Sequence, residues 1–363
     1  MTPAGSLPLV CVHEDRADYL IGVKLAVLSL ARHAPAFQVV VSSPGAKLDF
    51  VQWVDRQPNA RMANFRHIRQ GAGWNVKPSV LLEMLEERAD VVWIDSDIVV
   101  TGDMTRRFLG RPLDTLLATE ETYWGQEQGG DFRTVAWGLV PGRKLRCTVN
   151  SGVLRVTRSH VPLLRAWQTM LMHPLYLSAQ SRPWYERPLH MIGDQEALTG
   201  LLGSQEFAHL PVELLRRGTD IAQCFGPAGF TPGERLRALW GTGPSFIHAM
   251  GPKPWLRGER PPPLLRGADL VGGLRDWYRY LSLETSPYSV AARRYTSQPD
   301  VDVSWVRPRS PLGRGLTALG GERPAAPGLP VAVVDHLARQ LRKTLRIARY
   351  TQSPDFVLTE RPF

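Results

Sequence analysis

The chain has 363 residues, of which 43% are hydrophobic and 21% are charged, and these values are ordinary for a globular protein. Its net charge of +10 comes mostly from arginine, but no zinc-finger, basic-zipper or RNA-recognition motif accompanies it, so nucleic acid is not a predicted partner. No apolar run reaches the length of about 18 residues that a transmembrane helix needs, and the N-terminus lacks the pattern of a signal peptide. We therefore expect a cytoplasmic protein.

The N-terminal part of the chain alternates between two kinds of pattern. Near-continuous apolar runs predict buried strands over 7–13, 37–43 and 91–100. Apolar residues at helical spacing predict helices over 19–34 and 75–89. Strands of this kind that alternate with helices are typical of an α/β fold with a mostly parallel central sheet flanked by helices.

The middle of the chain continues this alternation. The run CTVNSGVLRV predicts a strand over 147–156, and helical spacing follows over 160–173. A further helix is predicted within 190–203, with Asp194 near its start, and SFIHAMG predicts a short strand over 245–251. These elements extend the same α/β body.

Proline and glycine mark the end of that body. The segment RGERPPPLLRG over 257–267 is a proline-rich break, so we predict a catalytic domain over 1–258. The remainder, 259–363, is predicted to be a Pro/Gly-rich and helical extension that faces the acceptor or a membrane. Within it, the stretch 306–330 is predicted to be a linker or an ordered segment without regular structure.

The last predicted helix, 331–350, is amphipathic. It has an apolar stripe and a set of basic residues: Val334, Leu337, Leu341, Leu345 and Ala348, and Arg339, Arg342, Lys343, Arg346 and Arg349. Such a helix can lie on an anionic membrane surface. The alternative is a helix that packs on its own domain and leaves the basic face in water. The first alternative predicts peripheral contact with the inner face of the membrane.

Two carboxylates interrupt the apolar run VVWIDSDIVV. Residues two apart in a strand face the same side, so Asp95 and Asp97 are expected to converge while Ser96 points away. Two like charges need a positive group between them, and carboxylates are natural ligands of a hard divalent cation. If the strand ends or turns at the pair, both acids lie where open α/β sheets bind ligands. The alternatives are solvated acids on an edge strand and an acidic pair bonded to arginine.

Several motifs follow one another in a fixed order. They are LVCVHED, Lys77 ahead of the acid pair, IDSD, NSGVLRV, GDQEAL and HAMGPKPW, and they span residues 9–255. The set resembles glycosyltransferase family eight, whose members are retaining enzymes of the GT-A nucleotide-diphospho-sugar transferase fold. The resemblance implies transfer of a hexose from a nucleotide-diphosphate sugar, UDP-glucose or UDP-galactose, to an unknown hydroxyl acceptor.

The resemblance implies a metal site. Asp95, Asp97 and His248 match the residues that hold a divalent cation in the family. A mixed set of oxygen and imidazole ligands favours manganese, with magnesium as the alternative. The cation would neutralise the diphosphate leaving group.

A nucleotide and phosphate site is implied next to the metal, with six residues: His13, Asp15, Lys77, Ser96, Gly251 and Lys253. The residues after the first strand would hold the base and ribose, and the lysines would contact the diphosphate. The glycine would let the backbone approach a phosphate. Two departures from the family pattern stand out: the loop from His248 to Lys253 is one residue shorter, and the turn HEDRAD lacks the usual Asn/Asp-Tyr arrangement. The second leaves the base open.

The donor sugar would be lined by Asn150, Ser151, Gly152, Asp194 and Gln195. A glutamine is a poor nucleophile, so Gln195 is predicted to stabilise an oxocarbenium-like centre through its carbonyl. Asp194 is predicted to hold sugar hydroxyls. A short-lived covalent intermediate and attack from the leaving-group face both remain open as mechanisms of retention.

The acceptor and two other functions also stay open. The acceptor could be a glycan, a lipid-linked molecule or a small molecule, and the segment 118–138 is either an acceptor-side loop or an irregular connection. A sugar nucleotidyltransferase would carry a Gly-rich basic loop after the first strand, but HEDRADYLIG is acidic there. A non-catalytic sugar-nucleotide-binding protein is the third possibility.

Overall fold

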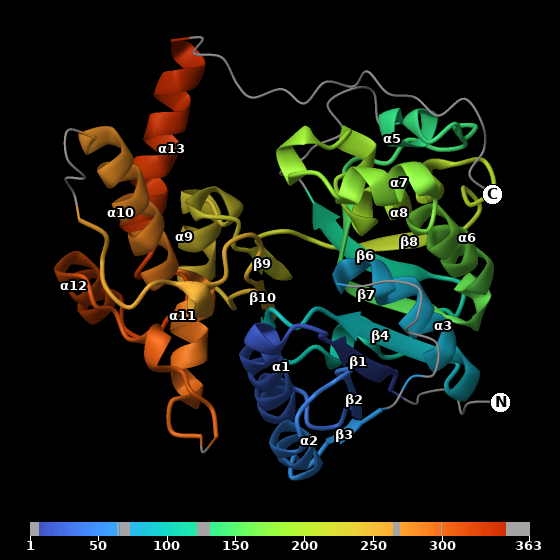
Figure 1. The fold of residues 1–363 in the computed structure, drawn as a ribbon, viewed down its shortest axis with the longest axis horizontal. Coiled ribbons are helices and arrows are strands. Elements are labelled where there is room, and N and C mark those ends of the chain that lie inside the picture. The colour runs from blue at the N-terminus through green and yellow to red at the C-terminus, as the bar shows by residue number, and fades with distance from the viewer. Residues whose placement is uncertain are drawn as a thin grey trace.

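The computed structural model describes residues 7–63, 65, 73–121, 131–263, 269–298 and 300–345. At its centre is a seven-stranded sheet in the order β3-β2-β1-β4-β7-β6-β8 (Figure 1). Its strands are β1 (Leu9–His13), β2 (Val39–Ser42), β3 (Ala60–Met62), β4 (Asp90–Ile94), β6 (Leu116–Glu121), β7 (Thr148–Thr157) and β8 (Val212–Leu215). Neighbouring strands are parallel except where β7 pairs with β4 and β6. The predicted mostly parallel sheet is confirmed.

A second, three-stranded sheet takes the order β5-β10-β9. It consists of β5 (Ile98–Val100), β9 (Ile221–Gln223) and β10 (Phe246–His248). The single strand predicted over 91–100 is therefore wrong, because β4 and β5 belong to different sheets. Both halves of the run are buried, so hydrophobicity alone does not reveal the turn between them.

Helices cover both faces of the central sheet, as predicted. On one face lie α1 (Leu20–His33) and α2 (Leu48–Asp55), which pack against Val10 and Val12 of β1. On the other lie α3 (Lys77–Glu87), α6 (Val161–Leu171) and α8 (Asp194–Gly203), which pack against the alternate residues Leu9 and Cys11. Because successive residues of a strand face opposite sides, a nearly continuous apolar strand serves both layers. Shorter helices are α4 (Thr105–Phe108), α5 (Phe132–Ala136) and α7 (Pro174–Gln180).

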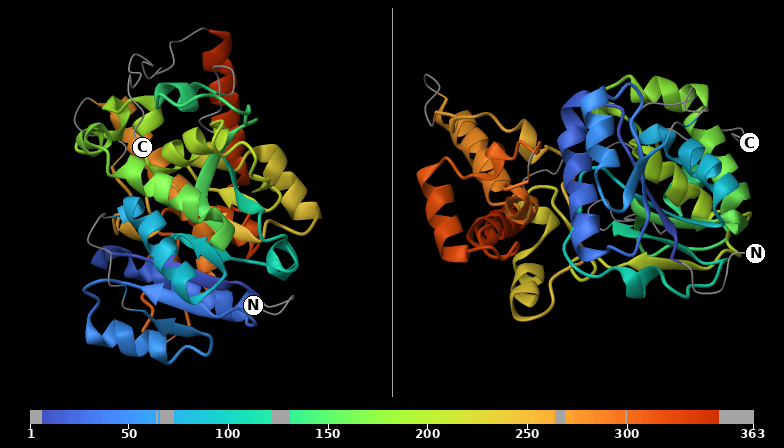
Figure 2. Two further views of the ribbon diagram at one scale, coloured as in Figure 1. Left: turned by 90° about the vertical axis from the view of Figure 1, so that its right-hand side faces the viewer. Right: turned by 90° about the horizontal axis from the view of Figure 1, so that it is seen from below.

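The C-terminal helices gather beside the sheet (Figures 1 and 2). They are α9 (Pro232–Trp240), α10 (Leu270–Glu284), α11 (Pro287–Ala292), α12 (Pro311–Gly320) and α13 (Leu329–Thr344). Tyr278 of α10 donates a hydrogen bond to Asp335 of α13 at 2.6 Å, so these two long helices lie side by side. Tyr288 and Val306 share one apolar cluster with Val10 of the sheet. The boundary at 258 remains a prediction. Among the described residues, none of the helices has the length and apolar character needed to span a bilayer.

Helix α12 overturns the prediction that 306–330 lacks regular structure. Ser310 caps the helix by accepting a hydrogen bond from the Gly313 backbone N–H at 2.9 Å. Buried Glu284 accepts hydrogen bonds from the backbone N–H groups of Arg309, at 2.6 Å, and Ser310, at 3.1 Å. A Cβ at Gly313 would lie 2.2 Å from a Glu284 oxygen, so glycine is needed for this close approach. Tertiary contacts thus stabilise a helix that its glycines would disfavour in isolation.

Candidate functional site

The acid pair lies in a tight turn between β4 and β5. The Ile98 backbone N–H donates to the Asp95 carbonyl at 3.0 Å, which closes the turn. The Asp95 N–H donates to the Gly152 carbonyl at 2.8 Å, and the Ala249 N–H donates to the Asp97 carbonyl at 2.9 Å. The turn is therefore held by β7 on one side and by the end of β10 on the other. Both acids lie where β4 ends.

Three side chains converge at this turn. Possible ligand atoms of Asp95, Asp97 and His248 all lie within 4.8 Å of one another. His248 Nε2 is 3.2 Å from Asp97 Oδ1 and 3.7 Å from Asp95 Oδ2. Oxygen ligands lie roughly 2.0–2.6 Å from a hard divalent cation, so ligand atoms about 3–5 Å apart can share one ion. The three residues therefore fit a divalent cation.

Close packing orients the histidine. A Cβ at Gly152 would lie 2.7 Å from His248 Cε1 and 2.9 Å from Asn150 Oδ1, closer than real atoms approach. Only glycine at this position of β7 leaves space for the imidazole in its observed place. His248 Nε2 is the ring nitrogen that lies next to the two carboxylates. The other ring nitrogen, Nδ1, is buried and has no hydrogen-bond partner among the described residues.

Two lysines balance the charge of the acid pair. Lys77 Nζ is 3.0 Å from Asp95 Oδ1, and Lys253 Nζ contacts Asp97 Oδ2. Burial would raise the pKa of Asp97, but Lys253 and His248 outweigh this effect and hold the pKa well below its usual range. Asp97 is therefore ionised at neutral pH. Among the described residues, the acid pair is therefore bonded to one lysine each, Asp95 to Lys77 and Asp97 to Lys253, rather than to arginine.

The loop after β10 brings Lys253 to this position. Gly251 adopts a φ of 73°, in the left-handed region that favours glycine. A Cβ there would also lie 3.0 Å from ring carbons of Phe225. Lys253 Nζ donates to the Ala249 carbonyl at 2.7 Å, which bends the loop back on itself. The ammonium group consequently lies next to a candidate metal ligand.

Lys77 links the acid pair to the predicted donor-sugar residues. It is almost fully buried, and its Nζ donates to Ser151 Oγ at 2.8 Å and lies 3.3 Å from Asp194 Oδ2. Ser151 Oγ in turn donates to Asp194 Oδ2 at 2.6 Å. Burial would lower the pKa of Lys77, but Asp194 and Asp95 raise it above its usual value. Burial raises the pKa of Asp194, and Lys77 and Ser151 offset this only in part.

Gln195 is held by the same strand. Asn150 Nδ2 donates to Gln195 Oε1 at 2.8 Å, and Asn150 Oδ1 accepts from the Gly152 N–H at 2.9 Å. Gln195 belongs to the first turn of α8, which begins at Asp194 directly after an extended Gly193. The side-chain amide is therefore fixed by β7 and only half-buried, so it remains open to a ligand.

The predicted nucleotide residues lie at the neighbouring strand end. His13 ends β1, and its Nδ1 is hydrogen-bonded to Ser42 Oγ at 2.8 Å. Burial lowers the pKa of His13 to about 4, although Asp15 and Glu14 oppose the shift, so the ring is neutral at pH 7. Its Nε2 has no partner within the described residues. Asp15 Oδ2 accepts from the Gly73 backbone N–H at 2.8 Å.

Glu14 and Trp93 were not predicted from the sequence, yet both contact the turn. Ser96 Oγ donates to buried Glu14 Oε2 at 2.7 Å, and Glu14 also accepts from Arg16 Nε at 2.7 Å. Trp93 Nε1 donates to Asp95 Oδ1 at 2.7 Å. Ser96 therefore faces the end of β1. Glu14 lies in the acidic turn HED, but the sequence does not show which acid of that turn is buried.

The structure brings together most of the predicted residues and places the others around them. Those joined by the contacts described above are Asp95, Asp97, His248, Lys253, Lys77, Ser151 and Asp194, with Asn150, Gly152 and Gln195 beside them. Part of the predicted acceptor-side segment, 122–130, lies outside the described residues.

No protein-family model and no curated protein matches the chain. Among solved structures, it is similar to the apo structure of WbbM, a bifunctional glycosyltransferase, with 15% identity over 69% of this chain and 47% of that chain, and a TM-score of 0.46. A mutant of LgtC gives 15% identity over 74% of this chain and 94% of that chain, with a TM-score of 0.46. The apo form of the glycosyltransferase GlyE of Streptococcus pneumoniae is 16% identical over 80% of this chain and 64% of that chain, with a TM-score of 0.44. The chain thus spans about half of WbbM and under two thirds of GlyE.

LgtC is a galactosyltransferase that has also been solved with donor and acceptor sugar analogues. WbbM and GlyE are likewise described as glycosyltransferases.

Proposed function

We propose that the chain is a metal-dependent retaining hexosyltransferase that uses a nucleotide-diphosphate sugar. One observation carries this proposal: a candidate metal triad and a candidate sugar-binding group meet at one edge of the sheet, joined by buried Lys77. Ligands of α/β proteins bind at this edge, beyond the carboxyl ends of the strands. A structural ion-pair network would explain the charges. It would not explain the half-buried amide of Gln195 or the buried Nε2 of His13, which has no partner among the described residues.

Asp95, Asp97 and His248 would hold manganese, or magnesium in its place. The bound cation would supply positive charge for the departing diphosphate. Lys253, which lies beside Asp97, is placed to bind a phosphate oxygen once the cation takes over the charge of that carboxylate. Lys77 would contact the diphosphate-sugar from the opposite side of the acid pair.

The donor sugar would lie against β7 and the start of α8. Asp194 would accept hydrogen bonds from sugar hydroxyls, because Ser151 and Lys77 fix its carboxylate. A carbonyl oxygen has two lone pairs, and Asn150 occupies one on Gln195 Oε1, which leaves the second for an electron-poor anomeric centre. Retention could follow either of the two routes named above. UDP-glucose and UDP-galactose are the proposed donors. Asp15 and the neutral imidazole ring of His13 would hold the nucleoside.

The first test is release of nucleotide from candidate donors. We expect slow hydrolysis of UDP-glucose or UDP-galactose that requires Mn²⁺ and stops when EDTA is added, because the triad needs the cation to bind the diphosphate. UDP release would be measured for both donors, their N-acetyl forms and GDP-mannose. Binding of a donor without release of UDP from any of them would favour a non-catalytic sugar-nucleotide-binding protein. Release of pyrophosphate from UTP and a sugar phosphate would instead favour a nucleotidyltransferase.

We also propose that α13 contacts an anionic membrane surface at the cytoplasmic face. Leu337 and Leu341 are 61% and 59% exposed, and Leu345, directly after the helix, is 60% exposed. Basic residues Arg339 and Arg342 lie on the same helix, which gives it the composition of an interfacial helix. The acceptor could then be lipid-linked, with a glycan or a small molecule as the alternatives.

Vesicle flotation tests the membrane proposal. The double variant Leu337→Glu/Leu341→Glu should lose most of its flotation with anionic phosphatidylglycerol vesicles, because two charges replace the apolar contact. Leu319→Glu is the matched control, since Leu319 on α12 is 88% exposed and lies outside the stripe. Equal flotation of the two variants would remove α13 from the proposed membrane surface.

A further inference from the structure

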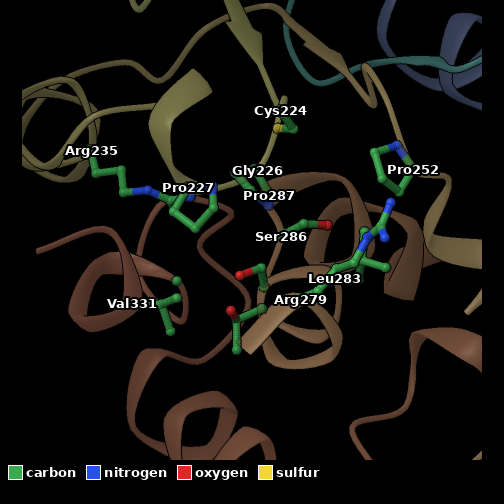
Figure 3. Close-up of a pocket in the computed structure, with 13 residues that line it drawn as sticks. Cys224, Gly226, Pro227, Arg235, Pro252, Arg279, Leu283, Ser286, Pro287 and Val331 are labelled. Atoms are coloured by element: carbon green, nitrogen blue, oxygen red, sulfur yellow. The ribbon is translucent and has the colours of Figure 1, made fainter. Parts of the chain in front are cut away.

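A cavity of about 60 Å³ lies outside the proposed donor site, among the C-terminal helices. Arg235 of α9 and Arg279 of α10 line it from opposite sides, and Pro252 lines it from the loop that carries Lys253 (Figure 3). Among the described residues, no aspartate or glutamate lines this cavity. Its charged lining is therefore entirely positive.

Arg235 is the group in this cavity that most needs a partner. Its side chain is buried, and among the described residues no carboxylate forms an ion pair with it. Nε donates to the Phe230 carbonyl at 2.9 Å and Nη1 to the Ala325 carbonyl at 3.1 Å. A guanidinium has five N–H groups, so several remain for another acceptor. A buried charge without a counter-ion is costly, and an anion in the cavity would remove that cost.

Arg279 supplies the second positive charge, on the side of the cavity that faces solvent. It is exposed on α10, while Arg235 is buried on the other side. The hydroxyls of Ser282, Thr285 and Ser286 also line the cavity, but each already donates a hydrogen bond within the protein. Their acceptors are the Tyr278 carbonyl at 2.7 Å, the Leu281 carbonyl at 2.9 Å and Ser289 Oγ at 3.0 Å. The arginines are therefore the donors available to a ligand.

We propose that this cavity binds a small oxyanion of the phosphate type between Arg235 and Arg279. The volume accommodates a few water molecules or one such ion. Two guanidinium groups are well suited to the planar, bidentate recognition of an oxyanion. The site is separate from the proposed donor site and does not depend on its function. Because Pro252 is adjacent to Lys253, an anion in the cavity would stabilise the loop that carries Lys253.

Isothermal titration with inorganic phosphate tests the proposal, on the metal-free full chain so that no cation competes for the ligand. Arg279→Gln should weaken phosphate affinity about tenfold or more, because it removes a charge-assisted hydrogen bond. Arg275→Gln is the matched control: Arg275 is exposed on the same helix but does not line the cavity, and its affinity should remain that of the parent chain. Equal affinities of both variants, or no phosphate binding by the parent chain, would overturn the site.

Two further measurements test the role of Arg235 and the size of the ligand. Arg235→Lys keeps the charge but loses the planar fork, and should also weaken phosphate binding; circular dichroism would establish that it is folded, and Arg279→Gln carries the test if it is not. Phenyl phosphate should bind more weakly than inorganic phosphate, since the cavity is small. Equal binding of the two would contradict a site for a free ion.

Discussion

Asp97→Asn should abolish metal-dependent nucleotide binding. Asparagine keeps the size of the side chain but removes the negative charge that contacts Lys253 and would hold the proposed cation. Changing a residue in the outer shell of a metal site costs about 10–100-fold in affinity, so loss of a direct carboxylate ligand should cost at least about a hundredfold. Isothermal titration of UDP in the presence of Mn²⁺ measures this loss, and donor hydrolysis should disappear with it.

Asp103→Asn is the control for this change. Asp103 is an exposed acid close in the sequence, and its Oδ1 accepts a hydrogen bond from the Thr105 N–H at 2.8 Å, which asparagine can also accept. UDP and Mn²⁺ should bind this variant as they bind the parent chain. If Asp97→Asn retained Mn²⁺-dependent UDP binding within a fewfold of the parent chain, the acid pair would not be the metal site.

The layered fold could be predicted because its signal is local. The apolar runs of β1 and β2 and the periodic helices α1 and α3 each contain enough residues to reveal their period. The turn at Asp95 could not, because the residues on both sides of it are buried in different sheets. Helix α12 could not either, because its stability comes from Glu284, which lies in another helix.

The candidate site, like the fold, has a part that the sequence predicts and a part that it does not. Motif order suggested which residue types belong to a donor site, but it did not show which of them touch. Lys77 and Asp194 are far apart in the chain and meet because α3 and the start of α8 pack on the same face of the sheet. The sequence does not single out Glu14, because its burial and its hydrogen bond to Ser96 depend on the packing of two strand ends. Contacts of this kind require the fold, since no local pattern encodes them.

Lys77→Met should both destabilise the protein and remove donor binding. Lys77 Nζ is 3.0 Å from Asp95 and 3.3 Å from Asp194, and the side chain is almost fully buried. Methionine fills similar space without charge, so the Asp194 carboxylate would remain buried without its positively charged lysine partner. Removing one partner of a buried ion pair costs about 3–5 kcal/mol. Urea unfolding at pH 7 measures this loss, with Lys144→Met as the control, since Lys144 is exposed and should change stability by less than about 0.5 kcal/mol.

The loss should also depend on pH in a defined direction. Burial already raises the pKa of Asp194 in the folded chain, and removal of Lys77 takes away the main effect that opposes the rise. An acid whose folded pKa lies above its unfolded value, about 3.9 for aspartate, binds more protons when folded, so stability falls as pH rises between the two values. Lys77→Met should therefore lose stability more steeply than the parent chain as pH increases from about 4 to 7. An unfolding free energy that rose with pH in this variant, relative to the parent, would show that Asp194 is not the group left without a partner.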